Sequence, residues 1–281
     1  MKILGISALY HDSAISYVSN GEIIEAVQEE RFSRVKHDAS FPDKSINYIL
    51  KKYSLKIEDF NAIVFFDKPF LKFERLLETF LTMAPRGFKT FKMAMPIWLN
   101  EKLFLKSYLT KYFKKHYESF DKNKLFFSEH HLSHASSAFF PSPFKDADIL
   151  TLDGVGEWAT STISYGLQNK IEIKKEIHFP HSLGLLYTAF TYYTGFKVNS
   201  GEYKLMGLAP YGNNKYSKKI LENLIDVKND GSFRLNIDFF DYVTGLKMTN
   251  DKFHKLFGHQ PRISEKENIT QFHMDIASSI Q

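Results

Sequence analysis

The sequence predicts an α/β fold in which helices pack on a mixed β-sheet. The first observation is a group of three short apolar runs at residues 2–8, 14–18 and 23–27. The last two runs flank Asn20-Gly21, a dipeptide typical of tight β-hairpins. The second observation is that segments with helical spacing and segments of strand type then alternate to the C-terminus. We therefore expect an antiparallel three-stranded meander that later strands extend and helices cover.

The other elements follow from their spacing and their boundary residues. Pro42 precedes a helix at 43–52, because Ile46, Ile49 and Leu50 recur on one side. Further strands are expected at 62–66, 124–127, 147–152, 161–167 and 171–177. Further helices are expected at 132–140, at 183–194 before Gly195, and at 268–280.

The last helix stops with the chain, without Gly, Pro or a polar tail, so we expect the native polypeptide to continue. Its apolar side, with Phe272, Ile276 and Ile280, is then expected to be exposed here or buried in a dimer.

Residues 68–120 form a basic and aromatic segment, with eleven Lys or Arg against four Glu, in a chain of net charge +5. Pro85 and Pro96 should divide it into two or three helices. Such a segment can bind membranes or nucleic acid. The alternative, which we favour, is a helical insertion at about 68–122 that packs its aromatic side chains on the body and leaves its lysines in solvent.

The composition excludes several classes of protein. The chain of 281 residues contains no cysteine, which rules out disulfides, thiolate nucleophiles and cysteine-ligated zinc or iron–sulfur sites. The N-terminus becomes polar too soon for a signal peptide, and no apolar run reaches the length of a membrane span. We therefore expect a cytoplasmic enzyme without a transmembrane segment and without a nucleic-acid partner.

The most informative motif is His130-His131-Leu132-Ser133-His134, followed by the apolar run that ends at Asp153-Gly154-Val155-Gly156-Glu157. A spacing of four places the imidazoles of His130 and His134 on one helix face, where they can share a metal ion. The strand-to-glycine turn can present the Asp153 carboxylate and bare backbone N–H groups to an anion. A histidine pair at this spacing also occurs on helix surfaces that bind nothing, and the spacing alone leaves both interpretations open.

Three other groups of residues are weaker signals. The loop after the first strand contains His11, Asp12 and Ser13, which suits phosphate or metal chemistry but also a polar turn. Residues 29–38 contain Arg31, Arg34, Lys36 and His37, which we interpret as a solvated charge run. Residues 195–212 contain four glycines, with Glu202 and Lys204 between the second and the third; they match neither a Walker A loop nor a dinucleotide-binding loop.

Taken together and in order, these motifs resemble the N-terminal part of the O-carbamoyltransferase family, whose members carbamoylate nodulation factors, aminoglycosides and cephems. The resemblance covers nearly the whole chain. The matching segments are Gly5–Ala14, Glu29–Pro42, His130–Phe140, Leu152–Glu157, Ser182–Thr188 and Gly195–Gly212.

The resemblance implies a fold of the actin, Hsp70 and sugar-kinase type (ribonuclease H-like), of which residues 1–281 are the N-terminal part of the catalytic domain. It implies ATP-dependent formation of carbamoyl-adenylate from carbamoyl phosphate, then transfer to a hydroxyl of a small molecule or glycan. The C-terminal half and the adenylate-forming domain are absent from this sequence. They are implied partners in cis or in trans, and a homodimer is an alternative.

The resemblance also assigns roles by position. It implies a divalent metal, iron first and zinc or manganese as alternatives, at His130, His134 and Asp153. It implies His11 and Asp12 on the catalytic side and Gly154 and Gly156 beside the phosphate. Gly201, Glu202 and Lys204 match the nucleotide side.

Two rival functions remain. The first is a sugar-kinase-like phosphotransferase. The histidine pair argues against it, because a sugar kinase is not expected to contain one. The second is a non-catalytic binding subunit of a split enzyme.

Overall fold

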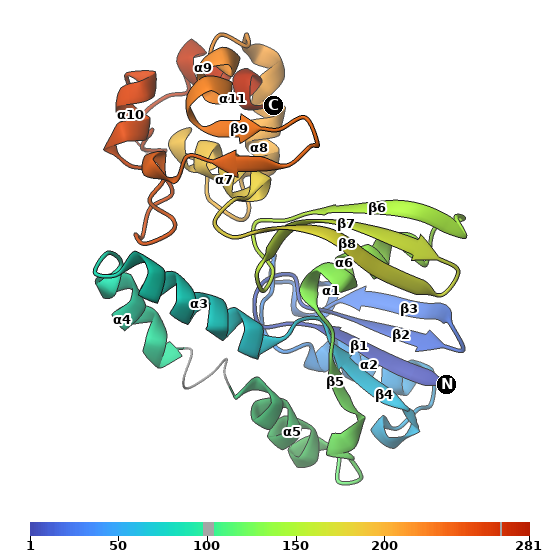
Figure 1. Cartoon of the computed structure of the whole chain (residues 1–281). Coiled ribbons are helices and arrows are strands. Elements are labelled where there is room, and N and C mark those ends of the chain that lie inside the picture. Colours follow the sequence, from blue (N-terminus) through green and yellow to red (C-terminus); the bar gives the residue numbers. More distant parts are fainter. Residues whose placement is uncertain (98–103, 265) are drawn as a thin grey trace. The chain divides into compact units, whose positions relative to one another are not determined.

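The computed structural model describes residues 1–97, 104–264 and 266–281 (Figure 1). The chain is mixed α/β, as predicted, and forms two compact units. Unit 1 comprises Met1–Phe73 and Pro96–Ser133, and unit 2 comprises Glu74–Met95 and His134–Gln281. The chain crosses between the units three times, within helices α3, α4 and α6.

Unit 1 is built on a five-stranded mixed sheet of order β3-β2-β1-β4-β5. The first three strands form the predicted antiparallel meander, and β4 pairs with β1 in parallel, followed by β5 in parallel. Asn20 and Gly21 both have positive φ, as their hairpin turn requires. The strands are β1 (Lys2–Ser7), β2 (Ala14–Ser19), β3 (Glu22–Gln28), β4 (Ala62–Phe65) and β5 (Leu125–Phe127).

Helices cover the apolar face of this sheet. They are α2 (Asp43–Lys52) and α5 (Leu105–His116), whereas the short helix α1 (Glu30–Ser33) follows β3 and has no buried residue. Leu4 and Ile6 of β1 pack in one buried cluster with Ile49 of α2 and Phe113 of α5. The N-terminus of α2 is capped from a distance, because the buried Glu29 carboxylate accepts hydrogen bonds from its first-turn N–H groups.

Unit 2 contains a three-stranded antiparallel sheet of β6 (Asp146–Leu152), β7 (Ala159–Leu167) and β8 (Lys170–His178). One face of this sheet packs through Ile149 on Ala135 and Phe139 of helix α6 (His130–Phe139). Gly166 allows this approach, because a Cβ there would lie 2.7 Å from the ring of Phe139.

A helical subdomain completes unit 2. Its helices are α7 (Leu183–Tyr193), α8 (Glu202–Leu208), α9 (Ser217–Asn223), α10 (Asp251–Phe257) and α11 (Gln271–Ile280), with a hairpin of β9 (Ile225–Val227) and β10 (Phe233–Leu235). Two further helices occupy the basic segment, α3 (Pro69–Met83) and α4 (Phe88–Ile97). Within unit 2, the hydroxyl of Thr90 on α4 donates to the carbonyl of Thr244, 2.8 Å away.

Three expectations need correction. Helix α6 begins at His130, two residues before the predicted start, because His130 and His131 belong to its first turn. Pro96 lies inside α4 near its C-terminal end and does not interrupt it. The apolar side of the final helix, which we expected to be exposed or buried in a dimer, is packed inside unit 2: Ile276 is fully buried, and Phe272 and Ile280 contact the same cluster.

Candidate metal centre

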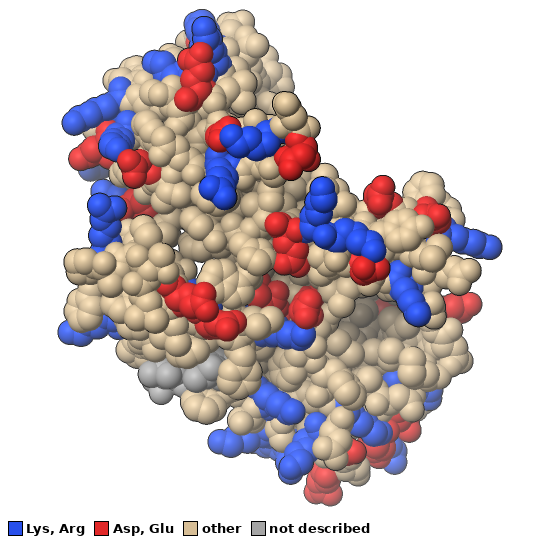
Figure 2. Space-filling view, viewed as in Figure 1, with Lys and Arg blue, Asp and Glu red and all other residues tan. Residues whose placement is uncertain are grey.

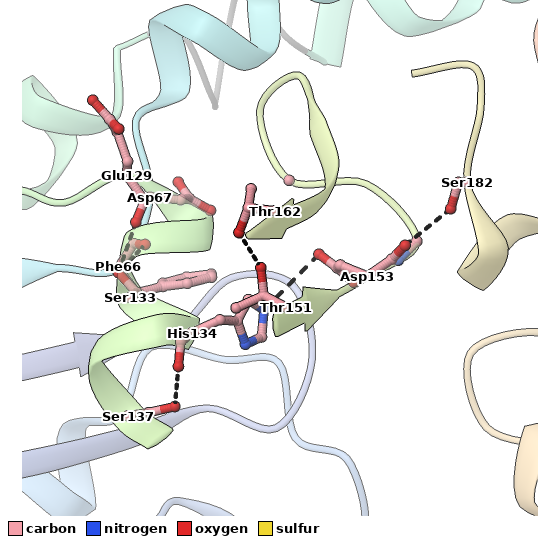
Figure 3. Close-up of polar contacts among 12 residues, drawn as sticks. Phe66, Asp67, Glu129, Ser133, His134, Ser137, Thr151, Asp153, Thr162 and Ser182 are labelled. Carbon is pink, nitrogen blue, oxygen red and sulfur yellow. Dashed lines mark hydrogen bonds and ion pairs between the residues drawn. The ribbon is translucent and has the colours of Figure 1, made fainter. Parts of the chain in front are cut away.

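His130, His134 and Asp153 converge, as the motif predicted. Each residue offers one ligand atom, and these three atoms lie within 4.8 Å of one another. The histidines are one turn apart on helix α6, and Asp153 follows the end of β6. His134 Nε2 lies 3.9 Å from Asp153 Oδ2, a contact drawn in Figure 3. About half of the His134 side chain is exposed, so a ligand can reach it.

The glycine turn after β6 fixes the orientation of Asp153. The Asp153 N–H donates to the carbonyl of Thr160, and the Gly156 N–H donates to the carbonyl of Ala159. These two bonds close a tight turn between β6 and β7. The Gly154 N–H donates to Oδ1 of Asp153 at 2.6 Å. One carboxylate oxygen is therefore held by the turn, while the other faces His134.

The start of helix α7 supports the same turn. Ser182 caps α7 by accepting a hydrogen bond from the Leu185 N–H, and its hydroxyl donates to the carbonyl of Asp153 at 2.9 Å (Figure 3). Gly184 is required there, because a Cβ would lie 2.6 Å from that carbonyl oxygen. Ser182 fell within the family-like segments, but nothing in its local sequence predicted contact with Asp153.

Arg75 of helix α3 binds the far side of the turn. Its Nη1 donates to the carbonyls of Gly156 and Glu157, each 2.7 Å away, and its guanidinium lies 5.4 Å from the ring centre of Phe179. Sequence reasoning missed this residue, because its partners lie about eighty positions further along the chain. The basic segment thus contributes at least one cation that holds the turn after β6.

A second cluster, in unit 1, joins His11, Asp12 and His37. His11 Nδ1 lies 2.8 Å from Asp12 Oδ2, and His37 Nδ1 lies 2.9 Å from Asp12 Oδ1. The carboxylate therefore bridges two imidazoles. Burial alone would raise the pKa of Asp12, but the hydrogen bonds with His37 and then His11 outweigh it, and the pKa is lowered.

This cluster corrects the interpretation of residues 29–38 as only a solvated charge run. His37 is held to Asp12, and the loop that contains them is closed by two backbone bonds, from Leu9 N to Ala39 O and from Ser13 N to Asp38 O. The signal was invisible locally, because His37 follows Asp12 by 25 residues. Two lysines of the basic segment, Lys68 and Lys72, are also paired within unit 1, with Glu129 and Asp67.

The candidate nucleotide residues lie at the start of helix α8. The Glu202 carboxylate accepts hydrogen bonds from the Asn199 and Gly201 N–H groups, both at 3.0 Å, and therefore holds the turn that precedes its helix. Lys204 is exposed, and its ammonium lies 5.9 Å from the ring centre of Tyr203. Their role toward a nucleotide stays a prediction.

The chemical types of the three donors suit a divalent metal. Two ligand atoms that each lie about 2.1 Å from one ion are at most ~4.2 Å apart, and the 3.9 Å between His134 and Asp153 falls within this limit. Two imidazoles and one carboxylate are accepted by iron, zinc and manganese. Such a set leaves coordination positions open for a substrate or for water.

Across the surface in Figure 2, lysine and arginine side chains are interspersed with aspartate and glutamate on the face shown. Among the described residues, no helix combines the length and the apolar character needed to cross a bilayer.

Comparisons with known proteins agree with the motif. The family described as "Carbamoyltransferase N-terminus" matches residues 2–281. An uncharacterized protein of Synechocystis sp. is 59% identical over 281 residues, which are 99% of this chain and 46% of that protein. The nodulation protein NolNO of Sinorhizobium fredii is 34% identical over 230 residues, which are 81% of this chain and 32% of that protein.

An uncharacterized protein of Methanocaldococcus jannaschii is 27% identical over 258 residues, which are 91% of this chain and 42% of that protein. The chain thus spans less than half the length of each of these relatives. The family match, however, runs from strand β1 to helix α11 and includes His130, His134 and Asp153. The chain therefore belongs to the carbamoyltransferase family, whose N-terminal region it matches.

Proposed function

We propose that this chain provides the acceptor side of an ATP-dependent O-carbamoyltransferase. In the proposed reaction, carbamoyl phosphate and ATP give carbamoyl-adenylate, and the carbamoyl group then passes to a hydroxyl of a small molecule or glycan. The observation that carries the proposal is the convergence of His130, His134 and Asp153 in a chain of this family. The five-stranded mixed sheet is consistent with the actin and sugar-kinase type of fold that we propose for the family.

The transfer step is an acyl substitution. The acceptor oxygen forms a bond to the carbamoyl carbon, the bond from that carbon to the AMP phosphate oxygen breaks, and AMP leaves with the electron pair. The acceptor proton passes to a base, which we assign to His11. Asp12 orients His11 through Nδ1, which leaves Nε2 available to take the proton. A bound metal would polarise the carbonyl and offset the charge of the leaving group.

The remaining residues have binding roles in this proposal. We place Asp153 and the turn at Gly154 and Gly156 beside the phosphate, and we assign Gly201, Glu202 and Lys204 to the nucleotide. We propose a cytoplasmic enzyme that is complete only with the C-terminal half and the adenylate-forming domain, in cis or in trans. A homodimer is the alternative assembly.

The experiment joins this chain to the part of the Synechocystis relative that follows the matched region. The chimera is incubated with ATP, ¹³C-labelled carbamoyl phosphate, Fe²⁺ and a panel of hydroxyl acceptors that contains chitotetraose and an aminoglycoside. Mass spectrometry should detect labelled carbamate esters with the wild-type site and none with His134→Ala. Transfer of phosphate instead of carbamoyl would favour the kinase-like alternative. Absence of both transfers, in a chimera that binds the metal, would favour a non-catalytic binding subunit.

A further inference from the structure

Unit 1 contains a cavity that the proposed function does not use. It has a volume of about 280 Å³ and lies between helices α2 and α5. Small-molecule sites usually begin at about 300 Å³, so this volume suits a small ligand. None of the described residues that line it belongs to the metal centre or to the cluster around Asp12. The lining consists of Asp43 and Asn47 from α2, Tyr112 and His116 from α5, and Tyr117, which follows α5.

The carboxylate of Asp43 is not needed to cap the helix on which it lies. Asp43 is the first residue of α2, where the unpaired backbone N–H groups of a helix attract a nearby acid. Two of these groups, those of Lys44 and Ser45, already donate to the buried carboxylate of Glu29. Among the described residues, the Asp43 carboxylate has neither a hydrogen bond nor an ion pair. It is therefore available to a ligand.

The charges around the cavity favour a cation. Partial burial raises the pKa of Asp43, the charge of His116 opposes this effect, and the carboxylate of Glu29 adds to it. Burial also raises the pKa of the Tyr117 hydroxyl, and the charge of Asp43 adds to that shift. None of the described lining residues is a lysine or an arginine, so an ionised Asp43 lacks a permanent counterion. A bound cation would supply it.

The cavity also offers hydrogen-bond acceptors and aromatic rings. His116 Nδ1 donates to the carbonyl of Tyr112, 2.9 Å away, which leaves Nε2 as an acceptor in the neutral ring. The hydroxyl of Tyr117 lies 3.5 Å from Oδ1 of Asn47, and its oxygen can accept a further hydrogen bond. The rings of Tyr112 and His116 stack with their centres 4.4 Å apart, and the ring centre of Tyr117 lies 6.5 Å from that of His116. Tyrosine rings of this kind attract organic cations.

We propose that this cavity binds a small primary ammonium ion, with its charge beside the Asp43 carboxylate. A primary ammonium has three N–H donors, which match the Asp43 carboxylate, His116 Nε2 and the Tyr117 hydroxyl. The alkyl part of the ligand contacts the rings of Tyr112 and Tyr117. The proposal is independent of the proposed function, because binding needs neither the metal nor a catalytic step.

NMR titration of the purified chain tests this assignment. The probe is n-butylammonium, and n-butanol and butyrate serve as neutral and anionic compounds of similar size. In the chain labelled with ¹³C-histidine and ¹³C-tyrosine, the ring signals of Tyr112, His116 and Tyr117 should shift as n-butylammonium is added. These shifts should saturate at concentrations at least ~10-fold lower than with n-butanol or butyrate, because only the cation pairs with Asp43.

Two variants separate the charge of the site from its acceptors. Asp43→Asn keeps the size of the side chain and removes its charge, so it should weaken the binding of n-butylammonium at least ~10-fold. Tyr117→Phe removes one acceptor and keeps the ring, so it should weaken binding by about 3-fold. The matched control is Glu22→Gln, which removes an exposed carboxylate from β3 and should bind the probe as the wild type does.

The melting temperature of Asp43→Asn should equal that of the wild type, because the exposed carboxylate has no partner in the fold that the change would remove. Equal affinity for the three compounds would overturn the proposal, and so would equal binding of n-butylammonium by Asp43→Asn and Glu22→Gln. A preference for butyrate would also overturn it, in favour of an anion held by a protonated His116.

Discussion

His134 Nε2 and Asp153 Oδ2 lie 3.9 Å apart, although one belongs to a helix and the other to the turn after a strand. The helix supplies His130 one turn earlier, and the turn holds the other oxygen of Asp153 through the Gly154 N–H. The distance is short enough for one ion to bridge the two groups. The arrangement is therefore compatible with a shared metal ion.

Replacing either group should weaken metal binding. His134→Ala and Asp153→Asn should each lower the affinity for Fe²⁺, Zn²⁺ or Mn²⁺ by at least ~10-fold, because one of three protein ligands is lost. Isothermal titration calorimetry of the purified chain measures this. The control is His178→Ala, since His178 is another exposed histidine and is paired with Glu176. Affinities equal to the wild type in both site variants would show that the cluster is not a metal site.

Arg75 should affect the same affinity without being a ligand. Arg75→Met removes both hydrogen bonds to the turn, so Asp153 should be less well ordered and metal binding weaker by about 3- to 10-fold. Arg75→Lys should fall in between, because an ammonium lacks the planar fork of the guanidinium. The control Arg86→Met removes an exposed arginine of the same segment. If Arg75→Met and Arg86→Met bind metal alike, Arg75 does not position the turn.

The Asp12 carboxylate bridges His11 and His37, so replacing either histidine should change the pKa of Asp12, and His37 should have the larger effect. His37→Gln should move the pKa of Asp12 upward toward its ordinary value, because the hydrogen bond with His37 is the largest influence that lowers it. His11→Gln should move it in the same direction by less. Carboxyl ¹³C NMR titration of Asp12 measures both shifts. An Asp12 pKa that does not respond to either change would contradict the bridged arrangement.

Asp275 predicts a pH-dependent contribution to stability. Hydrogen bonds from Lys215, then Gln271 and the Asn213 N–H, lower the pKa of this carboxyl from 3.8 to about 2. Because the folded value is below the unfolded value, the ionised form stabilises the fold above about pH 4, and this stabilisation is lost as the pH falls toward about 2.

Asp275→Asn should accordingly lower the melting temperature at pH 7, and the difference from the wild type should shrink between about pH 4 and about pH 2. Differential scanning calorimetry across this range provides the measurement. Asp226→Asn, which alters an exposed pair with Lys228, should have little effect at any pH. A constant difference between Asp275→Asn and the wild type down to about pH 2 would refute the assignment.

Features that depend on near neighbours could be predicted from the sequence. The hairpin at Asn20-Gly21 and the shared helix of His130 and His134 follow from spacing alone, because turn geometry and helical periodicity are local. The contacts of Arg75 and of His37 could not be predicted, because a polar side chain carries no local sign of a partner that only the tertiary fold brings close. The burial of helix α11 was predicted wrongly, because its apolar side chains also meet their partners only in the tertiary fold.

The position of the Asp153 carboxylate depends in part on an atom that is not there. Gly184 has no Cβ, and only for that reason can helix α7 begin against the Asp153 carbonyl and let Ser182 bind it. Anyone who transplants this histidine–aspartate cluster into another scaffold must therefore carry residues 182–184 along with it. The three candidate ligands alone would lack the contacts of Ser182 and Gly184 that orient Asp153.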